Sequence, residues 1–450
     1  MRHIQTLFLA LIILLGGFWA LAETWSFPIT NVFELRGIAI QFSGVVAIGF
    51  MSITMMLTLR LPWLERWMSG LDKMYRLHKW LGISILVVAI CHWLWAVAPK
   101  WASGLGWTVR SVRPPRVPIT DPLQAFLVSL RHPAESIGEW AFYAAALLIV
   151  LALVRYFPYR LFYKTHRLLA VVYLAVAFHA VVLIKFSYWT SPLGLLMAIL
   201  LTAGILSAVI VLLGLHGKAR QVWGRISSLQ AYPGVRTLEI VLDMSREWPG
   251  HKAGQFAFAM SDPSEGPHPY TIASDWNVDD GQICFLVKEL GDHTRLLKSK
   301  LKPGQEVRVE GPYGGFTFDD GYKHQIWVAG GIGITPFLAR MKHMALNIDK
   351  PDWPKGQIID LFHTTSDVDE QAFLKLAADA KIANIRLHLM IDLRDGRLTG
   401  ERLRAAIPDW RTSSLWFCGP EGFAADLTAD LTAHGFPTGQ NFHQEFFTLR

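Results

Sequence analysis

Cysteine is nearly absent from this sequence: the 450 residues include only Cys91, Cys284 and Cys418. Three cysteines so widely spaced exclude a disulfide framework and an iron–sulfur cluster held by four thiolates. The net charge of +7 does not indicate a nucleic-acid partner, because much of the basic excess lies in short loops between apolar segments.

The first half of the chain is rich in hydrophobic residues, which make up 52% of the whole sequence. Six runs are long enough to cross a hydrocarbon core of ~30 Å. They are Ile4–Ala22, Leu35–Leu57, His78–Val97, Ile137–Val154, His166–Ile184 and Pro192–Leu215. We therefore expect a multi-pass protein of the lipid bilayer, with a six-span α-helical bundle in residues 1–216. The first run also resembles a cleavable signal peptide, although its length favours a retained helix.

Basic loops predict the orientation of these spans. The loops in which Lys and Arg gather are residues 60–79, 155–167 and 218–225. By the positive-inside rule they are cytoplasmic, together with the polar second half, in the inner membrane of a bacterial-type cell. The outward segment 99–135 breaks this rule through Arg110, Arg113, Arg116 and Arg131. Its basic side chains either attract an anionic acceptor or lipid, or are simply solvated.

Histidine occurs inside only two of the apolar runs, and twice in each: His78 and His92, then His166 and His179. At ~1.5 Å per residue, the members of each pair lie roughly 20 Å apart along a helix. Ionisable side chains at membrane depth are costly and therefore indicate function. Two neighbouring helices would offer two stacked bis-imidazole sites, which suit low-spin haem b.

Zinc binding and simple core packing account less well for these histidines. Zinc prefers ligands clustered around one point, and a histidine that is only hydrogen-bonded in a core does not require matched pairs. One geometric difficulty remains, since a step of 13 residues does not return to the same helix face. We therefore expect the segment with His166 and His179 to be tightened, kinked or bulged, or the haems to be laterally offset.

The polar half predicts two further domains. Residues 217–320 contain alternating apolar strands typical of a small antiparallel β-barrel, at Val235–Asp243, Gln255–Met260, Gln282–Lys288 and Glu306–Glu310. Residues 321–450 alternate strands and helices, which predicts a doubly wound parallel α/β sheet. Its strands are expected at His324–Ala329, Gln357–Phe362, Ile385–Ile391 and Ser414–Phe417, with helices at Asp369–Ala380 and Glu421–His434.

Two chain segments have the features of phosphate-binding turns. Gly291–Arg295 opens a short helix, whose first N–H groups can hold a phosphate. Gly330, Gly331 and Gly333 follow the first strand of the α/β domain, and Thr335 and Pro336 begin the next helix. A glycine turn between a strand and a helix lets a pyrophosphate approach the backbone.

Several motifs occur in an order that covers nearly the whole chain. They are His78-x13-His92, His166-x12-His179, His268–Ser274, Gly291–Arg295, Gly311–Gly314, Gly331–Pro336 and Cys418–Pro420. With them the chain resembles the NADPH oxidase and ferric reductase family, in which a six-helix di-haem domain is fused to a ferredoxin–NADP reductase-type module. The resemblance implies two b haems, FAD, and NAD(P)H as substrate.

The resemblance also implies roles for individual residues. Tyr270 would pack on the flavin, Thr271 would hydrogen-bond its edge, and Ser274 would close that motif. His268 would take the place of an arginine on the pyrophosphate. The remaining flavin- and nucleotide-binding positions are Gly291, Thr294, Arg295, Gly330, Gly331, Gly333, Thr335, Pro336 and Gly419. The residues expected to act at the reacting rings are Cys418, Glu445 and Phe447.

The choice of nicotinamide is open. The resemblance implies an arginine after the second strand of the nucleotide domain in NADPH-specific relatives, and this chain has Asp367 there. The charge of Asp367 would repel the 2′-phosphate of NADPH. Alternatively, Asp367 only caps the following helix, or Arg394 or Arg397 compensates for its charge.

The predicted function is an NAD(P)H-oxidising transmembrane flavocytochrome b. Electrons would pass through FAD, the inner haem (His78 with His166) and the outer haem (His92 with His179) to an extracytoplasmic acceptor. That acceptor would be a ferric chelate or dioxygen, giving superoxide, with a quinone or periplasmic protein as the alternative. A haem-binding membrane sensor or transport module is the alternative from another functional class.

Overall fold

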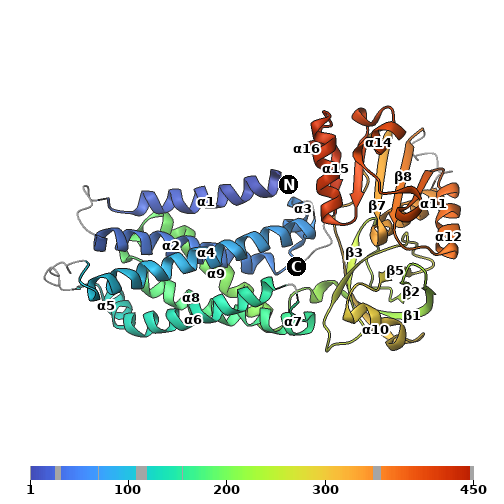
Figure 1. Ribbon diagram of the computed structural model, residues 1–450. Helices are drawn as coiled ribbons and strands as arrows, with labels where there is room; N and C mark the ends of the chain where they lie inside the picture. The colour runs from blue at the N-terminus through green and yellow to red at the C-terminus, as the bar shows by residue number, and fades with distance from the viewer. Residues whose placement is uncertain are drawn as a thin grey trace. The chain divides into compact units, whose positions relative to one another are not determined.

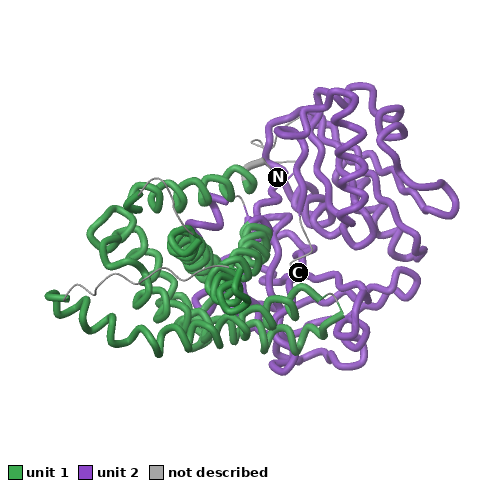
Figure 2. The backbone as a smooth tube through the Cα atoms, turned by 60° about the vertical axis from the view of Figure 1, so that its left-hand side comes forward, with its two compact units in different colours: residues 1–61, 74–216, 450 green, residues 62–73, 217–449 purple. Residues whose placement is uncertain are grey.

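The computed structural model describes residues 2–25, 32–68, 70–107, 119–154, 156–347 and 356–445. Arg110, Arg113 and Arg116 of the predicted outward segment lie outside these ranges. The chain divides into two compact units (Figure 2). The first consists of residues 1–61, 74–216 and 450, and the second of residues 62–73 and 217–449. The short segment 62–73 therefore belongs with the polar half, although it lies between two apolar runs of the sequence.

The first unit is helical, and all six predicted spans are confirmed as helices long and apolar enough to cross a membrane. They are α1 (Arg2–Ala22), α2 (Val32–Leu57), α4 (Leu71–Gly104), α6 (Arg131–Leu153), the pair α7 (Tyr159–Arg167) and α8 (Leu169–Leu183), and α9 (Pro192–Leu212). Two short helices, α3 (Pro62–Trp67) and α5 (Pro122–Ser129), lie in the connections. The chain is a multi-pass membrane protein, as its composition predicted.

The fifth span is interrupted one residue after Arg167. Helix α7 ends at Arg167 and α8 begins at Leu169. At the junction the Leu168 N–H donates to the Thr165 carbonyl at 3.0 Å, a three-residue step typical of a tightened turn. The prediction that the helix with the 13-residue histidine step cannot be regular is confirmed.

The helices of this unit approach closely where small and polar residues meet. Ser52 of α2 and Tyr173 of α8 share a buried hydrogen bond of 2.8 Å between their hydroxyls. Gly204 of α9 faces the same ring, and a Cβ there would lie 2.0 Å from the Tyr173 hydroxyl. In lipid, such small-residue packing and polar pairing take over much of the role that hydrophobic burial has in water.

The second unit contains a six-stranded antiparallel sheet in the order β4-β3-β6-β1-β2-β5. Four of its strands, β1, β2, β3 and β5, are labelled in Figure 1. Its strands are β1 (Gln221–Tyr232), β2 (Thr237–Met244), β3 (Phe256–Met260), β4 (His268–Thr271), β5 (Gln282–Lys288) and β6 (Glu306–Tyr313). A bridge between Ile272 and Phe285 joins the two edge strands. The four predicted strands are present, while β1 and β4 were not anticipated. Helix α10 (Asp292–Lys300) follows β5.

A parallel five-stranded sheet follows, in the order β11-β10-β7-β8-β9. Its strands are β7 (His324–Gly330), β8 (Ile358–Thr365), β9 (Arg386–Ile391), β10 (Ser414–Cys418) and β11 (Phe442–Gln444). All seven residues of β7 are buried, as expected for a central strand covered on both faces. The predicted doubly wound domain is confirmed, with β11 as an additional edge strand.

Helices cover both faces of this parallel sheet (Figure 1). One core joins the sheet to α11 (Thr335–Asn347) and α12 (Glu370–Ile382). The other joins it to α14 (Gly400–Ala406) and α15 (Glu421–Ala433). The carboxyl ends of β7 and β10 meet at one edge, where the glycine turn after β7 lies.

Candidate functional site

The four intramembrane histidines lie in two pairs, as the sequence predicted. The ring centroids of His78 and His166 are 5.9 Å apart, and those of His92 and His179 are 6.3 Å apart. In both pairs one ring comes from α4 and the other from the α7–α8 span. This separation leaves room for one metal ion between the two rings, as an axial ligand pair requires.

The outer pair is oriented by hydrogen bonds from neighbouring helices. His92 Nδ1 lies 3.0 Å from the Ser43 hydroxyl of α2, and His179 Nδ1 lies 2.8 Å from the Ala134 carbonyl of α6. A carbonyl can only accept, so Nδ1 of His179 carries the proton and Nε2 is left bare. This arrangement is typical of imidazole ligands, whose second nitrogen is fixed by an outer partner.

Two glycines make room for this outer pair. A Cβ on Gly138 of α6 would lie 2.0 Å from His179 Nδ1, and a Cβ on Gly44 of α2 would lie 3.3 Å from the His92 ring. Sequence reasoning missed these two glycines and Ser43. The sequence offered one signal for them: small residues in α2 and α6, two spans that carry none of the paired histidines.

The His268–Ser274 motif begins on β4 and presents an aromatic surface. Tyr270 lies 5.9 Å from Phe285 and 6.4 Å from His268 between ring centroids. Thr271 is buried, and within the described residues its hydroxyl has no hydrogen-bond partner. A buried hydroxyl of this kind suits a ligand that supplies the missing partner. Ser274 does not face this site, because its hydroxyl accepts a bond from the Cys284 N–H at 3.0 Å.

His268 stacks on His293 of α10, with ring centroids 3.8 Å apart and planes 8° from parallel. Burial, and then the charge of the neighbouring ring, lowers the pKa of His268 to about 3. Burial also lowers the pKa of His293. At neutral pH both stacked rings are therefore uncharged. An arginine at this position would carry a fixed positive charge, whereas His268 can supply only hydrogen bonds.

The start of α10 is shaped by Thr294. Its hydroxyl accepts hydrogen bonds from the Leu290 and Gly291 N–H groups at 2.9 and 3.0 Å. Thr294 is therefore engaged in the turn itself, while Arg295 is exposed on the same first turn.

The glycine turn after β7 is packed against the end of β10. A Cβ on Gly333 would lie 2.2 Å from the Cys418 carbonyl, and a Cβ on Gly330 would lie 2.7 Å from Pro420. Gly419 has the Gly330 backbone 3.1 Å from its own Cβ position. Only Gly331 requires its freedom for conformation, with φ at +57°. Three of these four glycines are thus explained by close packing of two strand ends.

A cavity of about 980 Å³ opens at this edge of the parallel sheet. It is bordered by the glycine turn and the ends of β8 and β10. Among its lining residues are Lys288, Gly330, Gly331, Gly333, Ser366, Asp392, Arg397, Gly419 and Glu445. Thr335 and Pro336 are buried at the start of α11 and do not line it; the Thr335 hydroxyl donates to the Ile332 carbonyl at 2.7 Å.

Cys418 and Glu445 lie on neighbouring strand ends, since the Glu445 N–H donates to the Phe417 carbonyl at 3.3 Å. Burial, and then the charge of Glu445, raises the pKa of the Cys418 thiol. Burial, and then the charge of Asp72, raises the pKa of the Glu445 carboxyl, so its protonated form is favoured. Within the described residues Glu445 Oε2 has no hydrogen-bond partner. Phe447 lies outside the described residues.

The structure changes the interpretation of Asp367. Its carboxylate accepts from Lys288 Nζ at 2.6 Å and from Arg236 at 3.2 Å, both in the antiparallel-sheet domain. Asp369, two residues later, is the residue that caps α12, through the Ala372 N–H at 3.1 Å. The predicted role of Asp367 as a helix cap is therefore wrong, and its role beside the ribose stays a prediction.

The structure also separates the two arginines proposed as alternatives. Arg394 is paired with Asp395 at 2.9 Å. Arg397 lines the large cavity, as does Asp392. Of the two, Arg397 is therefore the one that borders the cavity.

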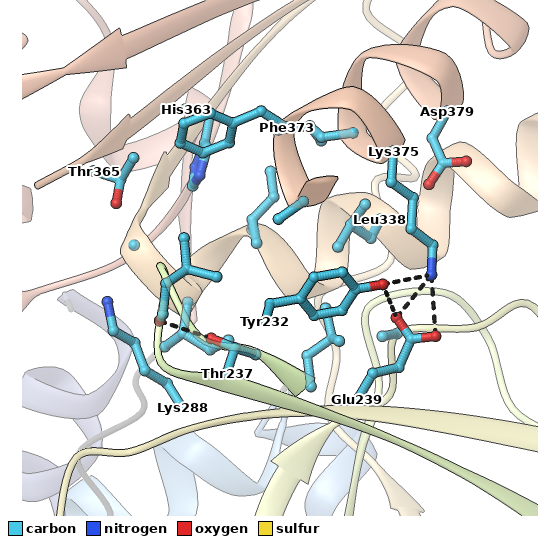
Figure 3. Close-up of a pocket in the computed structure, with 18 of the residues that line it drawn as sticks. Tyr232, Thr237, Glu239, Lys288, Leu338, His363, Thr365, Phe373, Lys375 and Asp379 are labelled. Carbon is cyan, nitrogen blue, oxygen red and sulfur yellow. Dashed lines mark hydrogen bonds and ion pairs between the residues drawn. The ribbon is translucent and has the colours of Figure 1, made fainter. Parts of the chain in front are cut away.

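A second, smaller cavity of about 90 Å³ lies between the two domains of this unit. Figure 3 shows it bordered by Tyr232 and Glu239 on one side and by Lys375 and Phe373 on the other. Its wall is mostly apolar, and Lys288 borders both cavities.

Two family models match the chain. The ferric reductase like transmembrane component matches residues 43–177, and an FAD-binding domain matches residues 225–317. The first match includes His78, His92 and His166 and ends just before His179, and the second includes the Tyr270 motif.

Individual relatives match parts of the chain. The reductase component of propane 2-monooxygenase from Rhodococcus jostii is 25% identical over 211 residues, or 43% of this chain and 55% of that protein. An NADPH oxidoreductase from Mycobacterium tuberculosis is 34% identical over 133 residues, covering 28% and 32%. Ferric reduction oxidase 8 from Arabidopsis thaliana is 31% identical over 134 residues, covering 28% and 18%. The chain thus spans less than two thirds of the length of these relatives.

Proposed function

Because this chain joins a ferric reductase-like transmembrane component to an FAD-binding reductase module, we propose that it is a transmembrane NAD(P)H-oxidising flavocytochrome b. The observation that carries the proposal is the pairing of His78 with His166 and of His92 with His179 across two membrane helices. A purely nucleotide-sensing or transporting membrane module has no need for two such pairs at two depths.

The residues fit two haems. The proposed ligands are His78 and His166 for the inner site and His92 and His179 for the outer one. The Ala134 carbonyl supports this assignment, because it holds the His179 proton on Nδ1 and leaves Nε2 for iron. With both axial positions taken by histidine, substrates would exchange electrons at the edge of the group rather than bind to iron.

The reductase module fits FAD and a nicotinamide nucleotide. FAD, when bound, takes two electrons as hydride from the nicotinamide and gives them up singly. Tyr270 would pack on its ring system. The Thr271 hydroxyl, which has no partner among the described residues, would bond its edge. The cavity at the glycine turn would take the nucleotide, and Glu445 in its lining would hold a proton rather than a charge.

Sidedness follows from the loops. The Lys- and Arg-rich segments at residues 60–79 and 218–225 support a cytoplasmic reductase module and an outward-facing outer pair, in a bacterial-type inner membrane. The matched family model and the Arabidopsis relative both have ferric reduction in their names. We therefore propose a ferric chelate on the outer side as the acceptor.

The test is anaerobic addition of NADH or NADPH to the purified holoprotein while the haem α-band is recorded. The expected result is flavin bleaching followed by haem reduction. Ferric citrate, oxygen and a quinone are then offered separately, outside and inside proteoliposomes. Haems that stay oxidised after flavin reduction would refute the transmembrane path, and reoxidation by oxygen alone would replace the ferric chelate with dioxygen.

A further inference from the structure

The turn between β1 and β2, residues 233–236, contacts the parallel-sheet domain. The Gly234 N–H donates to the Asp369 carboxylate at 2.9 Å. A Cβ on Gly234 would lie 2.1 Å from the Val368 carbonyl, so only glycine allows this approach. A turn of one domain thus touches the backbone of the loop that leads from β8 into α12.

Two cations of the same sheet reach the same loop. Lys288 of β5 and Arg236 of the turn both donate to the Asp367 carboxylate. Lys288 and Asp367 are largely buried, with 12% and 18% of their side chains exposed. Chiefly through the hydrogen bond from Lys288, the pKa of Asp367 is lowered. The carboxyl is therefore ionised at neutral pH and is engaged by its two partners in the antiparallel-sheet domain.

A third contact lies further along the chain, on α12. Lys375 Nζ donates to Glu239 at 2.8 Å and to the Tyr232 hydroxyl at 3.3 Å (Figure 3). Burial alone would lower the pKa of Lys375, but the bonds with Glu239 and Tyr232 raise it overall. We call this set of contacts the hairpin interface. On one side it consists of residues 232–239 and Lys288, and on the other of residues 366–375.

The hairpin interface ends at the wall of the nucleotide cavity. Residues 364–366 line that cavity, and Asp367 is the next residue. Lys288 lines it too, so the same side chain borders the cavity and holds the loop. Any loosening of Asp367 would therefore displace one wall of the cavity.

We propose that Asp367 is a positioning residue, which through Lys288 and Arg236 holds the 364–366 wall where a nicotinamide nucleotide of either kind can bind. Asp367 does not select between NADH and NADPH by repulsion of the 2′-phosphate. The inference rests on the proposed function in one respect, namely that the cavity takes a nicotinamide nucleotide.

The substitution Asp367→Asn keeps the shape of the side chain and removes its charge. The expected result is a rise in KM of about tenfold for NADH and NADPH alike, the change equivalent to ~1.4 kcal/mol, with kcat for flavin reduction little changed. A residue that repels the 2′-phosphate would behave differently: its loss would lower KM for NADPH and raise it for NADH. That opposite shift, or no shift in either KM, would overturn the proposal.

A charge exchange tests the same interface at residues that do not line the nucleotide cavity. Lys375→Glu and Glu239→Lys each place like charges together and should raise KM for both nucleotides. The double variant restores an ion pair and should recover most of the affinity. Lys381→Met, at an exposed position on the same helix, is the matched control and should leave both constants unchanged.

Hydrogen exchange separates this inference from the proposed function. In Asp367→Asn, amides of residues 364–376 should exchange faster than in the unaltered protein, with no nucleotide present. Unchanged exchange there would refute the positioning role even if the enzyme is active. Conversely, if neither nucleotide reduces the flavin of the unaltered protein, the proposed function fails, while faster exchange in the variant still supports the interface.

Discussion

The two units use their amino acids in opposite ways at their candidate sites. In the membrane unit, side-chain chemistry defines the site: four histidines meet in two pairs, and neighbouring helices orient the outer one. In the second unit (residues 62–73 and 217–449), called the reductase unit here, backbone shape defines much of the site. Several motif residues there stabilise turns of the backbone. Thr294 caps α10, Ser274 holds Cys284, and Gly330 and Gly333 allow β7 and β10 to meet.

This difference separates two kinds of sequence motif. A ligand motif marks the atom that does the chemistry, so a substitution should remove the group bound there. A glycine or threonine in a phosphate-binding motif marks the path of the backbone, so a substitution should deform the cavity and weaken many contacts at once. The two units should therefore respond to substitution in different measurements.

The largest effect is expected from His92→Ala. It removes one ligand of the outer pair, so haem content should fall by half and outward electron transfer by more than about 100-fold, beyond the 10–100-fold typical of losing an outer partner. Flavin reduction by nucleotide should continue. Pyridine haemochrome content and stopped-flow absorbance measure both. Cys91→Ser, at the adjacent exposed position, is the control; retention of two haems in His92→Ala would contradict the ligand assignment.

Gly333→Ala should deform the nucleotide cavity without changing haem content. The new methyl group would overlap the Cys418 carbonyl, and such overpacking costs about 1–3 kcal/mol. KM for the nucleotide should rise and the unfolding temperature of the reductase unit should fall. Ala429→Gly, on an exposed position of α15, should cost ~1 kcal/mol of stability with no change in KM. Normal nucleotide affinity in Gly333→Ala would show that the turn tolerates displacement.

Gly138→Ala tests the membrane unit for the backbone dependence seen in the reductase unit. The added methyl group would displace the His179 ring and its bond to Ala134, so outer haem affinity should fall by about 10–100-fold. Gly37→Ala is the control, because its Cβ would meet no atom within 4 Å. Titration of apoprotein with haemin compares the two. Equal affinities would mean that the ring has room to move.

The smallest effect is expected from Glu445→Gln and concerns pH. The folded-state pKa of Glu445 is raised, so its stabilising contribution is complete below its ordinary pKa of about 4.3 and is lost as pH rises through the folded-state value. Glutamine mimics the neutral carboxyl and should flatten two declines: that of the unfolding temperature between the ordinary and the folded-state pKa, and that of flavin reduction above the folded-state pKa. Parallel pH profiles for the two proteins would refute a protonated Glu445.

Much of the fold could be predicted because it depends on local pattern. Apolar length identified all six spans, and β5 begins and ends where alternation placed it. The 13-residue histidine step predicted an irregular helix, and the structure places the irregularity at Leu168. By contrast β1, β4 and β11 were missed. The four- and three-residue strands β4 and β11 carry too little pattern and form only because a neighbouring strand pairs with them. In the longer β1 a bulge between Ile226 and Ser228 breaks the alternation.

The candidate site divides along the same line. Residue type and spacing identified His78, His92, His166 and His179, because an ionisable group in an apolar run is informative by itself. Spacing could not identify Gly44 or Gly138, whose importance comes from a ring on another helix. Nor could it assign Asp367, whose partners Arg236 and Lys288 lie more than 75 residues away along the chain.

The sequence by itself determined the classes of group that the protein can hold: two imidazole pairs at two membrane depths and a glycine turn between a strand and a helix. Only the tertiary structure decided which charges remain available to a ligand. Asp367 is ion-paired with Lys288 of the neighbouring domain, and Arg394 is ion-paired with Asp395. His268 is uncharged beside His293. The physical reason is that charge and protonation depend on distance and burial, which residues far apart in sequence supply only after folding.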